Sequence, residues 1–393
     1  MKQERLPLPQ AREAEFARAK ESLGYQDARV YRLDEQLNGL PRELPDVVVL
    51  EPGKNGHYGP VFAHIIEDLE NNQRKIKVDG VSIPIPITSN TVTLVETSTG
   101  NAKDAFVRAA DYLGYECVVV MPSGLPEARY RLPEQDYLQG QPEVIRADSG
   151  DYALGMTTKL RELLATNPER VARGDKPYYC LNHAVSAADT TVRAMSKLGE
   201  VMAQKIHEKY NKPLGDLVVT MGNGASVCAL GLLAKEVYPD LRITAIEALA
   251  SGWIYDLFAQ RHGLESYWEK YGMKPGSLMP AYTAYGSTAP MKEVLPLQIR
   301  AIDEFVHDFE LITDRLTNQA YKEMSPQPSD GQRALIANLP DTSTLPPELH
   351  KFYGNTALMG FVEADKILRR NKMRGGERKL VGTVAYDLRD KYS

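Results

Sequence analysis

The fold is decided by the stretch DVVVLEPGKNGHYGPVFAHIIEDLE, residues 46–70. It begins with a β-branched run that is typical of a buried strand. It ends in a segment with apolar residues on one helical face and proline at the first turn. Between the two lies the glycine-rich turn PGKNGHYGP, residues 52–60. The stretch therefore predicts a strand, a turn and a helix in succession.

The same unit recurs twice along the chain. It is repeated at residues 91–113, around the turn TSTGN, and at residues 217–236, around the turn GNGAS. Further strands are predicted at 117–121, 243–247 and 380–385. Strands that alternate with helices favour α/β layers around a mostly parallel sheet. Residues 73–90 are expected to form an inserted hairpin or loop.

Composition limits the class of protein. The 393 residues are enough for two domains, and the 43% hydrophobic and 25% charged content is ordinary for a soluble globular protein. The formal net charge of -5, without a local run of Lys and Arg, argues against nucleic-acid binding. The isolated cysteines Cys117, Cys180 and Cys228 are expected to be buried reduced thiols of a cytoplasmic protein. No run of about 18 apolar residues occurs, so neither export nor membrane insertion is expected.

Two of the turns are suited to binding anions. Free backbone N–H groups at a helix N-terminus attract negative charge, and small residues allow close approach. We expect a substrate carboxylate at Thr97, Ser98, Thr99, Gly100 and Asn101. We expect a phosphate at Gly222, Asn223, Gly224, Ala225 and Ser226. Either turn taken alone could equally be a simple helix cap.

A dinucleotide-binding fold is the first alternative. The sequence GNGASV resembles the start of G-x-G-x-x-G, and Glu247 ends the next strand where a ribose-binding acid would stand. Val227 occupies the third glycine position, however, and several α/β units precede this one. The fit is therefore partial.

The order of all the motifs resembles that of the cysteine synthase-like family of fold type II pyridoxal phosphate enzymes. The turn EPGKNGHYGP stands where the family has N-P-x-x-S-x-K-D-R, and ETSTGN resembles E-x-T-S-G-N. MPSGLPEAR is similar to M-P-x-x-x-S-x-E-R, LNHAVSAAD to Q-F-x-N-P-A-N, and GNGAS to the phosphate loop G-T-G-G-T. The opening VYRL and the closing YDLRDKY also resemble family segments. The resemblance covers roughly residues 28–393, and collinearity makes it more specific than any single motif.

The resemblance implies a two-domain, three-layer α/β/α fold, tryptophan synthase β-like. The expected parts are a solvated helical extension at 1–28, a domain at 48–185 with the substrate loop, and a domain from 29–47 and 186–393 with the phosphate loop. It also implies a homodimer and a lyase or transferase of amino acid metabolism with a small anionic substrate. Thr356, in a Ser/Thr-rich turn late in the chain, would face the cofactor's ring nitrogen, or would only cap a helix.

The turn at 52–60 departs from the family at its anchoring lysine. The aligned position falls on His57 or Tyr58, and neither side chain can form an imine. The resemblance therefore leaves pyridoxal phosphate open as a cofactor, but not as an internal aldimine at residues 57–58. Lys54 is expected to be a solvated loop residue. Lys103 most often would face water, yet its position at a helix N-terminus makes it a candidate catalytic residue.

Three hypotheses follow from this substitution. The first is a diverged enzyme that acts on a small amino acid-like or phosphorylated substrate, with His57 and Tyr58 as acid and base. The second is a non-catalytic relative, a pseudoenzyme that binds a small anionic ligand or a partner, in which His57 and Tyr58 fill vacated space. The third is an enzyme that holds pyridoxal phosphate noncovalently or through another lysine.

Overall fold

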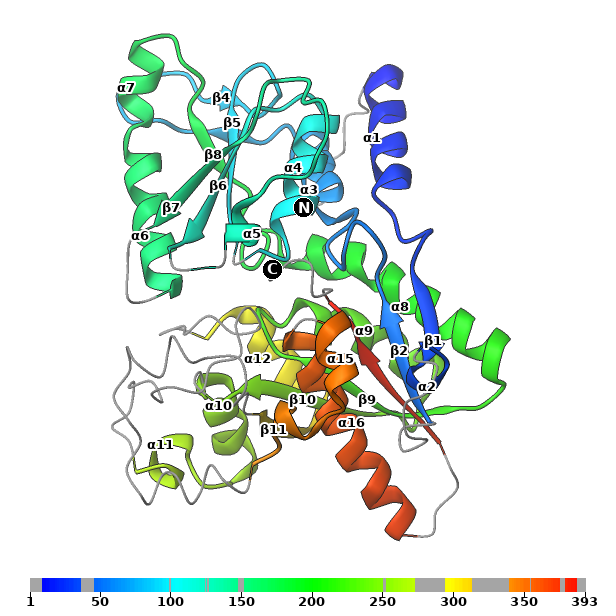
Figure 1. The fold of residues 1–393 in the computed structure, drawn as a ribbon. Helices are drawn as coiled ribbons and strands as arrows, with labels where there is room; N and C mark the ends of the chain where they lie inside the picture. Colours follow the sequence, from blue (N-terminus) through cyan, green and yellow to red (C-terminus); the bar gives the residue numbers. More distant parts are fainter. Residues whose placement is uncertain are drawn as a thin grey trace. The chain divides into compact units, whose positions relative to one another are not determined.

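The chain forms two compact units, each built around its own sheet (Figure 1). The first comprises residues 1–26 and 55–195, and the second comprises residues 27–54 and 196–393. The computed structural model describes residues 9–36, 46–98, 100–123, 125, 127–147, 152–249, 252–272, 294–312, 339–353, 355–374 and 379–386. This mixed α/β architecture with parallel sheets confirms the predicted fold class.

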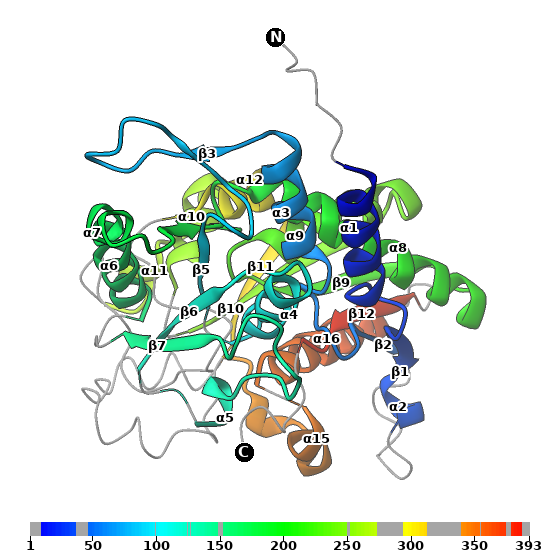
Figure 2. The same ribbon diagram turned by 90° about the horizontal axis from the view of Figure 1, so that it is seen from above.

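The first unit contains a four-stranded parallel sheet in the order β7-β6-β5-β8. Its strands are β5 (Thr93–Thr97), β6 (Cys117–Pro122), β7 (Glu143–Ala147) and β8 (Tyr178–Cys180). Its helices are α1 (Gln10–Ser22), α3 (Val61–Asn71), α4 (Lys103–Tyr112), α5 (Glu127–Tyr130), α6 (Tyr152–Ala165) and α7 (Asn167–Ala172). Helices α3 and α4 lie on one side of the sheet and α6 on the other (Figure 2). Val95, Val120 and Met156 belong to the core under α6.

Two segments of this unit follow the sequence in part. The insertion at residues 73–90 carries the antiparallel pair β3 (Lys75–Ile76) and β4 (Ile85–Pro86), as the hairpin alternative predicts. Helix α1 is not the solvated extension that the sequence suggests, because Phe16 and Ala19 are fully buried. The sequence did not indicate this burial, because the apolar residues of α1 form only a narrow stripe on an otherwise polar helix.

The second unit contains a six-stranded sheet in the order β1-β2-β12-β9-β10-β11. All neighbours are parallel except β1 and β2. Its strands are β1 (Arg29–Arg32), β2 (Val47–Glu51), β9 (Leu214–Thr220), β10 (Arg242–Ala248), β11 (Val306–Ile312) and β12 (Leu380–Val384). Its helices are α2 (Leu33–Gln36), α9 (Ala225–Val237), α10 (Trp253–His262), α11 (Tyr267–Lys270), α12 (Pro296–Glu304), η1 (Thr342–Thr344), α15 (Pro347–Phe352) and α16 (Asn355–Met373). Leu358 and Phe361 of α16 pack on Val218 and Val381 in the main core cluster.

The division between the units differs from the predicted one. Strand β2 pairs with β1 and β12, so residues 48–54 belong to the second unit instead of opening the first domain. At the other end, residues 186–195 belong to the first unit, and the long helix α8 (Ala188–Tyr210) begins there and continues into the second. Within the described ranges, no helix is both long and apolar enough to cross a membrane.

Candidate active site

The turn before α3 holds the two side chains that replace the expected lysine. His57 and Tyr58 are 5% and 7% exposed, so both rings are buried. Their ring centroids are 4.3 Å apart. The Tyr58 ring also lies 6.2 Å from that of Phe62, in the first turn of α3. Both residues are therefore part of a packed aromatic group, and neither is a solvated loop residue.

His183 completes this group from a different part of the chain. It follows the end of β8, and its ring forms T-shaped pairs with Tyr58 and Phe62, with centroids 5.2 Å and 5.5 Å apart. The Thr191 hydroxyl donates to the His183 carbonyl over 2.8 Å, which fixes the backbone there. His183 lies in the family-like motif LNHAVSAAD, which does not by itself mark it as a catalytic residue.

Glu96 pairs with His183. Its Oε2 atom lies 3.3 Å from His183 Nδ1 and accepts the His183 backbone N–H over 3.2 Å. Its Oε1 atom accepts the N–H of Thr97 over 2.8 Å. Glu96 is 2% exposed, so its carboxylate is a buried acceptor that is paired on both oxygens.

The topology of the sheet explains why these residues meet. Strands β5 and β8 are parallel neighbours, so their carboxyl ends lie at the same edge of the sheet. Glu96 is near the end of β5, and His183 follows β8 by three residues. A carboxylate, an imidazole and a phenol that lie close together are groups that can exchange protons. The arrangement is therefore suited to general acid–base chemistry beside Tyr58.

The substrate loop follows β5 directly. The Ser98 hydroxyl accepts the N–H of Gly100 over 2.9 Å, and the N–H of Ser98 donates to Val120. Together with the Thr97 N–H, which Glu96 accepts, three of the amides expected to bind a carboxylate are bonded within the protein. Thr99 lies outside the described residues. The carboxylate site at 97–101 remains a prediction.

Arg129 is a further charged residue at this loop. It is 4% exposed, and its guanidinium donates to Asn101 Oδ1 over 2.9 Å. Its side chain also packs against the face of Gly100, where a Cβ atom would lie 2.8 Å from the guanidinium nitrogen. The E-A-R signature of the motif at 121–129 could have pointed to it, because a buried arginine beside a substrate loop is suited to anions.

Lys103 is buried, contrary to the more common outcome expected for it. It is 3% exposed, and its ammonium donates to the carbonyl of Arg131 and lies 3.2 Å from Asp104. These contacts hold the amine against its own helix and the following segment. Binding a cofactor through Lys103 would require these bonds to be broken.

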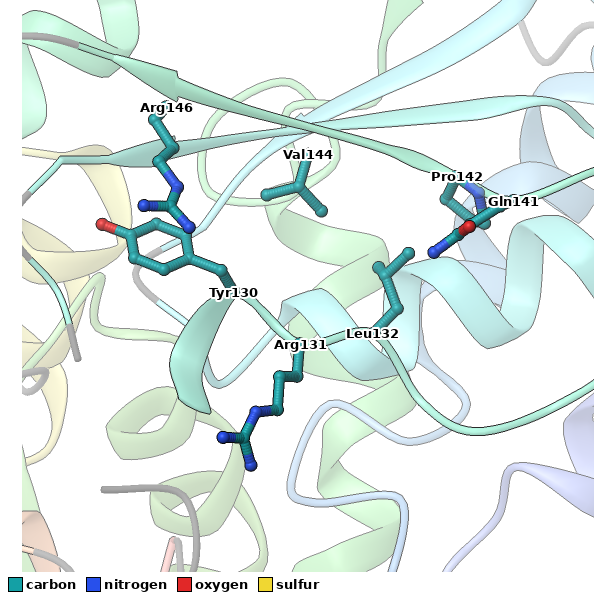
Figure 3. A pocket seen from close by; sticks show the side chains of 7 residues that line it. All are labelled: Tyr130, Arg131, Leu132, Gln141, Pro142, Val144 and Arg146. Carbon is teal, nitrogen blue, oxygen red and sulfur yellow. The ribbon is translucent and has the colours of Figure 1, made fainter. Parts of the chain in front are cut away.

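The segment around Arg131, whose carbonyl accepts from Lys103, also lines a pocket of about 290 Å³. Figure 3 shows this pocket, in which the Arg146 guanidinium lies 3.9 Å from the centre of the Tyr130 ring. Arg146 is paired with Glu127, so its charge is already balanced. The Arg131 side chain points away from Val144 in this view. We therefore do not include the pocket in the candidate active site.

The predicted phosphate loop lies in the second unit, between β9 and α9. Gly224 has φ +88°, and a Cβ atom there would lie 2.5 Å from the Leu297 carbonyl, so only glycine fits. Gln298 donates to the Gly222 carbonyl over 2.7 Å and fixes the loop from α12. Asn223 Oδ1 accepts the Ala225 N–H over 3.0 Å, which occupies one of the amides expected to bind phosphate.

Thr356 lies in the first turn of α16 in the same unit. It is 3% exposed, and its hydroxyl has no hydrogen-bond partner among the described residues. A buried hydroxyl without a partner is costly unless a ligand supplies one. Helix α16 packs on β12 and β9 and leads into the start of parallel β12. Its N-terminus therefore lies at the carboxyl edge of the sheet, as does the loop at 222–226.

These features of the second unit fit a pyridoxal phosphate. The loop at the N-terminus of α9 is suited to the phosphate, and the Thr356 hydroxyl is suited to the ring nitrogen. Residues 57 and 58, in the first unit, carry an imidazole and a phenol, and neither group is a primary amine. Glu247 does not support the dinucleotide alternative, since it is fully buried and accepts the N–H of Tyr255 over 2.9 Å.

Comparison with known proteins identifies the family. A family model described as "Pyridoxal-phosphate dependent enzyme" matches residues 62–326, about two thirds of the chain. The chain belongs to this family. It is 24% identical over 160 residues to a probable cysteine synthase of Bacillus subtilis (strain 168), a match that spans 40% of this chain and 46% of that protein. The recognition of a cysteine synthase-like member of the pyridoxal phosphate family is thereby confirmed.

Solved structures show the same fold. O-ureido-L-serine synthase matches with a TM-score of 0.58 and 15% identity, over 95% of this chain and 92% of that one. A hydrogen sulfide-producing enzyme from Fusobacterium nucleatum matches with a TM-score of 0.57 and 14% identity, over 95% and 99%. An O-acetyl serine sulfhydrylase isoform from Entamoeba histolytica matches with a TM-score of 0.53 and 14% identity, over 99% and 90%.

Proposed function

We propose that this pyridoxal phosphate family member is a diverged cysteine synthase-like lyase or transferase without the covalent lysine anchor at the usual turn. Its substrate would be a small amino acid-like or phosphorylated molecule. The observation that carries the proposal is the buried group of His57, Tyr58, His183 and Glu96 at that turn. A turn that had only lost its function would not need a paired carboxylate and imidazole beside it.

Neither Lys103 nor Lys54 is placed to replace the lysine that would bind the cofactor at this turn. Lys103 is engaged by Arg131 and Asp104, as described above. Lys54 belongs to the second unit and is exposed, and its backbone N–H donates to Asp27 over 3.0 Å. An imine requires a primary amine, and the turn presents an imidazole and a phenol.

The roles of the four residues follow from their contacts. Glu96 Oε2 lies 3.3 Å from His183 Nδ1 and would hold the imidazole beside Tyr58 for proton transfer. Tyr58 forms a T-shaped pair with the His183 ring and supplies a phenol as the proton donor. The His57 ring lies 4.3 Å from that of Tyr58, between centroids, and provides a second imidazole for proton transfer. Burial of all four excludes water and strengthens their mutual electrostatic interactions.

The cofactor would be held by the second unit. The loop at 222–226 would bind its phosphate and Thr356 its ring nitrogen, because these groups lie at one edge of the same sheet. Pyridoxal phosphate supplies an electron sink for charge that develops beside an amino group. Ser226→Ala is expected to weaken phosphate binding by about 1 kcal/mol, measured by calorimetry with inorganic phosphate. If the wild type binds no phosphate at low salt, the loop is only a helix cap and not a phosphate site.

The central experiment combines spectroscopy and turnover. The purified protein is mixed with pyridoxal phosphate and treated with borohydride, and we expect no covalent label at residues 54–60 or at Lys103. Turnover is then measured with O-acetyl-L-serine and sulfide as probe substrates, chosen because a structural neighbour is an O-acetyl serine sulfhydrylase. Tyr58→Phe should reduce kcat by about 100-fold without loss of folding, because it removes only a hydroxyl.

Two outcomes would overturn this proposal. A label on Lys54 or Lys103 after borohydride, with absorbance near about 410 nm in the untreated protein, would show that the anchor had moved. A Tyr58→Phe variant with the same kcat as the wild type would favour the non-catalytic alternative, in which Tyr58 only fills space. In that case Tyr58→Lys is expected to restore a yellow complex with the cofactor.

The second candidate function is a non-catalytic relative that binds a small anionic ligand or a partner. The observation that favours it is the internal bonding of the substrate-loop amides of Thr97, Ser98 and Gly100. Binding of a carboxylate without any turnover would support this alternative. For either function we propose a homodimer, which light scattering on the purified protein would test.

A further inference from the structure

The segment that follows α1 touches the turn carrying His57 and Tyr58. The Asn55 side-chain amide donates to the carbonyl of Ser22 over 3.1 Å. Gly59 approaches the same segment so closely that a Cβ atom would lie 2.3 Å from the Leu23 carbonyl oxygen. Residues 22–23 therefore contact both ends of the turn through backbone atoms, and all of them belong to the first unit.

Tyr25 contacts the middle of the turn. Its hydroxyl donates to the backbone carbonyl of His57 over 2.7 Å, and its side chain is 6% exposed. Burial, and to a lesser degree the neighbouring Tyr58, raises the pKa of the Tyr25 hydroxyl far above its usual value. The hydroxyl is therefore a permanent donor at neutral pH, and it acts on the peptide group that joins His57 to Tyr58.

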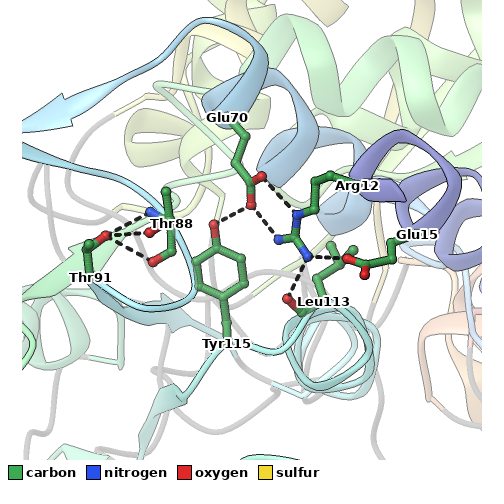
Figure 4. Close-up of polar contacts among 7 residues, drawn as sticks. All are labelled: Arg12, Glu15, Glu70, Thr88, Thr91, Leu113 and Tyr115. Carbon is green, nitrogen blue, oxygen red and sulfur yellow. Dashed lines mark hydrogen bonds and ion pairs between the residues drawn. The ribbon is translucent and has the colours of Figure 1, made fainter. Parts of the chain in front are cut away.

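Helix α1 itself is fixed to α3, the helix that the turn leads into. The Arg12 guanidinium donates to both carboxylate oxygens of Glu70 and to the carbonyl of Leu113 (Figure 4). The Tyr115 hydroxyl donates to the same Glu70 over 2.7 Å. Near the other end of α1, Lys20 lies 2.7 Å from Glu67. These bonds hold α1 along α3 and thereby present Tyr25 to the turn.

We propose that Tyr25 is a positioning residue, which sets the orientation of the His57 and Tyr58 rings against His183 through its bond to the His57 carbonyl. The proposal rests on the proposed acid–base role of those rings. Rotation of this one peptide group would move both side chains, because they lie on either side of it. A residue from a segment some 30 positions earlier in the chain thus belongs to the function of the turn.

The test compares two variants that each delete one buried tyrosine hydroxyl. Tyr25→Phe removes the bond to the His57 carbonyl. Tyr115→Phe removes a bond to Glu70 at the far end of α3 and leaves Glu70 with its Arg12 partner. The ring resonances of His57 and His183 are recorded by NMR in both variants, assigned through His→Gln substitutions. This readout does not depend on turnover.

We expect the His57 and His183 ring resonances to shift in Tyr25→Phe and to remain as in the wild type in Tyr115→Phe. The kcat for the probe substrates should fall about five- to tenfold in Tyr25→Phe with KM unchanged, because the proton-transfer groups move and the substrate loop does not. Similar urea midpoints for the two variants would show that the difference is not one of folding. Unchanged ring resonances in a folded Tyr25→Phe variant would overturn the proposal. If the resonances shift in Tyr25→Phe but the wild type shows no turnover, the proposed function is refuted and the positioning role of Tyr25 is not.

Discussion

Substitution of Glu96 by glutamine tests whether the carboxylate organises the candidate active site. Both carboxylate oxygens accept backbone hydrogen bonds, from Thr97 at 2.8 Å and from His183 at 3.2 Å. An amide has only one oxygen, so in either rotamer one of these two buried N–H groups loses its acceptor. A buried donor without an acceptor costs about 1–3 kcal/mol, and the remaining bond weakens when the acceptor loses its charge. Glu96→Gln should therefore lower the free energy of unfolding by about 2–4 kcal/mol.

Urea unfolding of the wild type, of Glu96→Gln and of Glu67→Gln measures this effect. Glu67 is the control, because it is a carboxylate that pairs with Lys20 while its side chain is 22% exposed. Such a partly solvated pair contributes about 0.5 kcal/mol. The reasoning is refuted if Glu96→Gln lowers the free energy of unfolding no more than Glu67→Gln does. That result would mean that water, and not the N–H groups of Thr97 and His183, satisfies the Glu96 carboxylate.

Three further substitutions test other parts of the structure. Burial raises the pKa of Glu363 to about 8, so its contribution to stability is present below about pH 4.5 and is lost as the pH rises through about 8. Glu363→Gln should then be more stable than the wild type by about 4–5 kcal/mol at about pH 9 in urea unfolding, and a difference independent of pH would contradict this. Gly59→Ala should cost about 3 kcal/mol in thermal unfolding, because its Cβ would meet the Leu23 carbonyl at 2.3 Å; a neutral variant would mean that the two segments do not touch. Gly224→Ala should cost about as much, roughly 3 kcal/mol, through its positive φ and the contact with Leu297, and an unchanged urea midpoint would show that α12 does not pack on the loop.

The sequence predicted the fold well where the pattern is local. The strand–turn–helix units at 46–70, 91–113 and 217–236 are all present, because β-branched runs and helical periodicity encode single elements. The pairing of strands is not local. Nothing near residue 47 indicates that β2 lies between β1 and β12, so the domain boundary at residue 48 was misplaced.

The candidate site could be predicted only in part, for the same reason. A family-like turn marks His57 and Tyr58, which the structure shows to be buried, and their catalytic role stays a prediction. His183 was missed as a candidate, since the strand that carries it becomes a neighbour of β5 only in the folded sheet. The signal that could have indicated His183 is that a polar residue lies near the end of each of two strands, Glu96 in β5 and His183 after β8. Lys103 was expected at the surface, and it is buried because a segment 28 residues later supplies the carbonyl that binds it.

The position of β12 has a consequence for biosynthesis. This strand lies between β2 and β9, yet it is encoded about 330 residues after β2. At a synthesis rate of about 5–20 residues per second, β2 would leave the ribosome roughly 15–65 s before its partner. During that interval the unpaired edge of Val47–Glu51 is a template for pairing with other chains. We therefore expect nascent chains arrested before residue 380 to require a chaperone, and to aggregate through this edge when none is present.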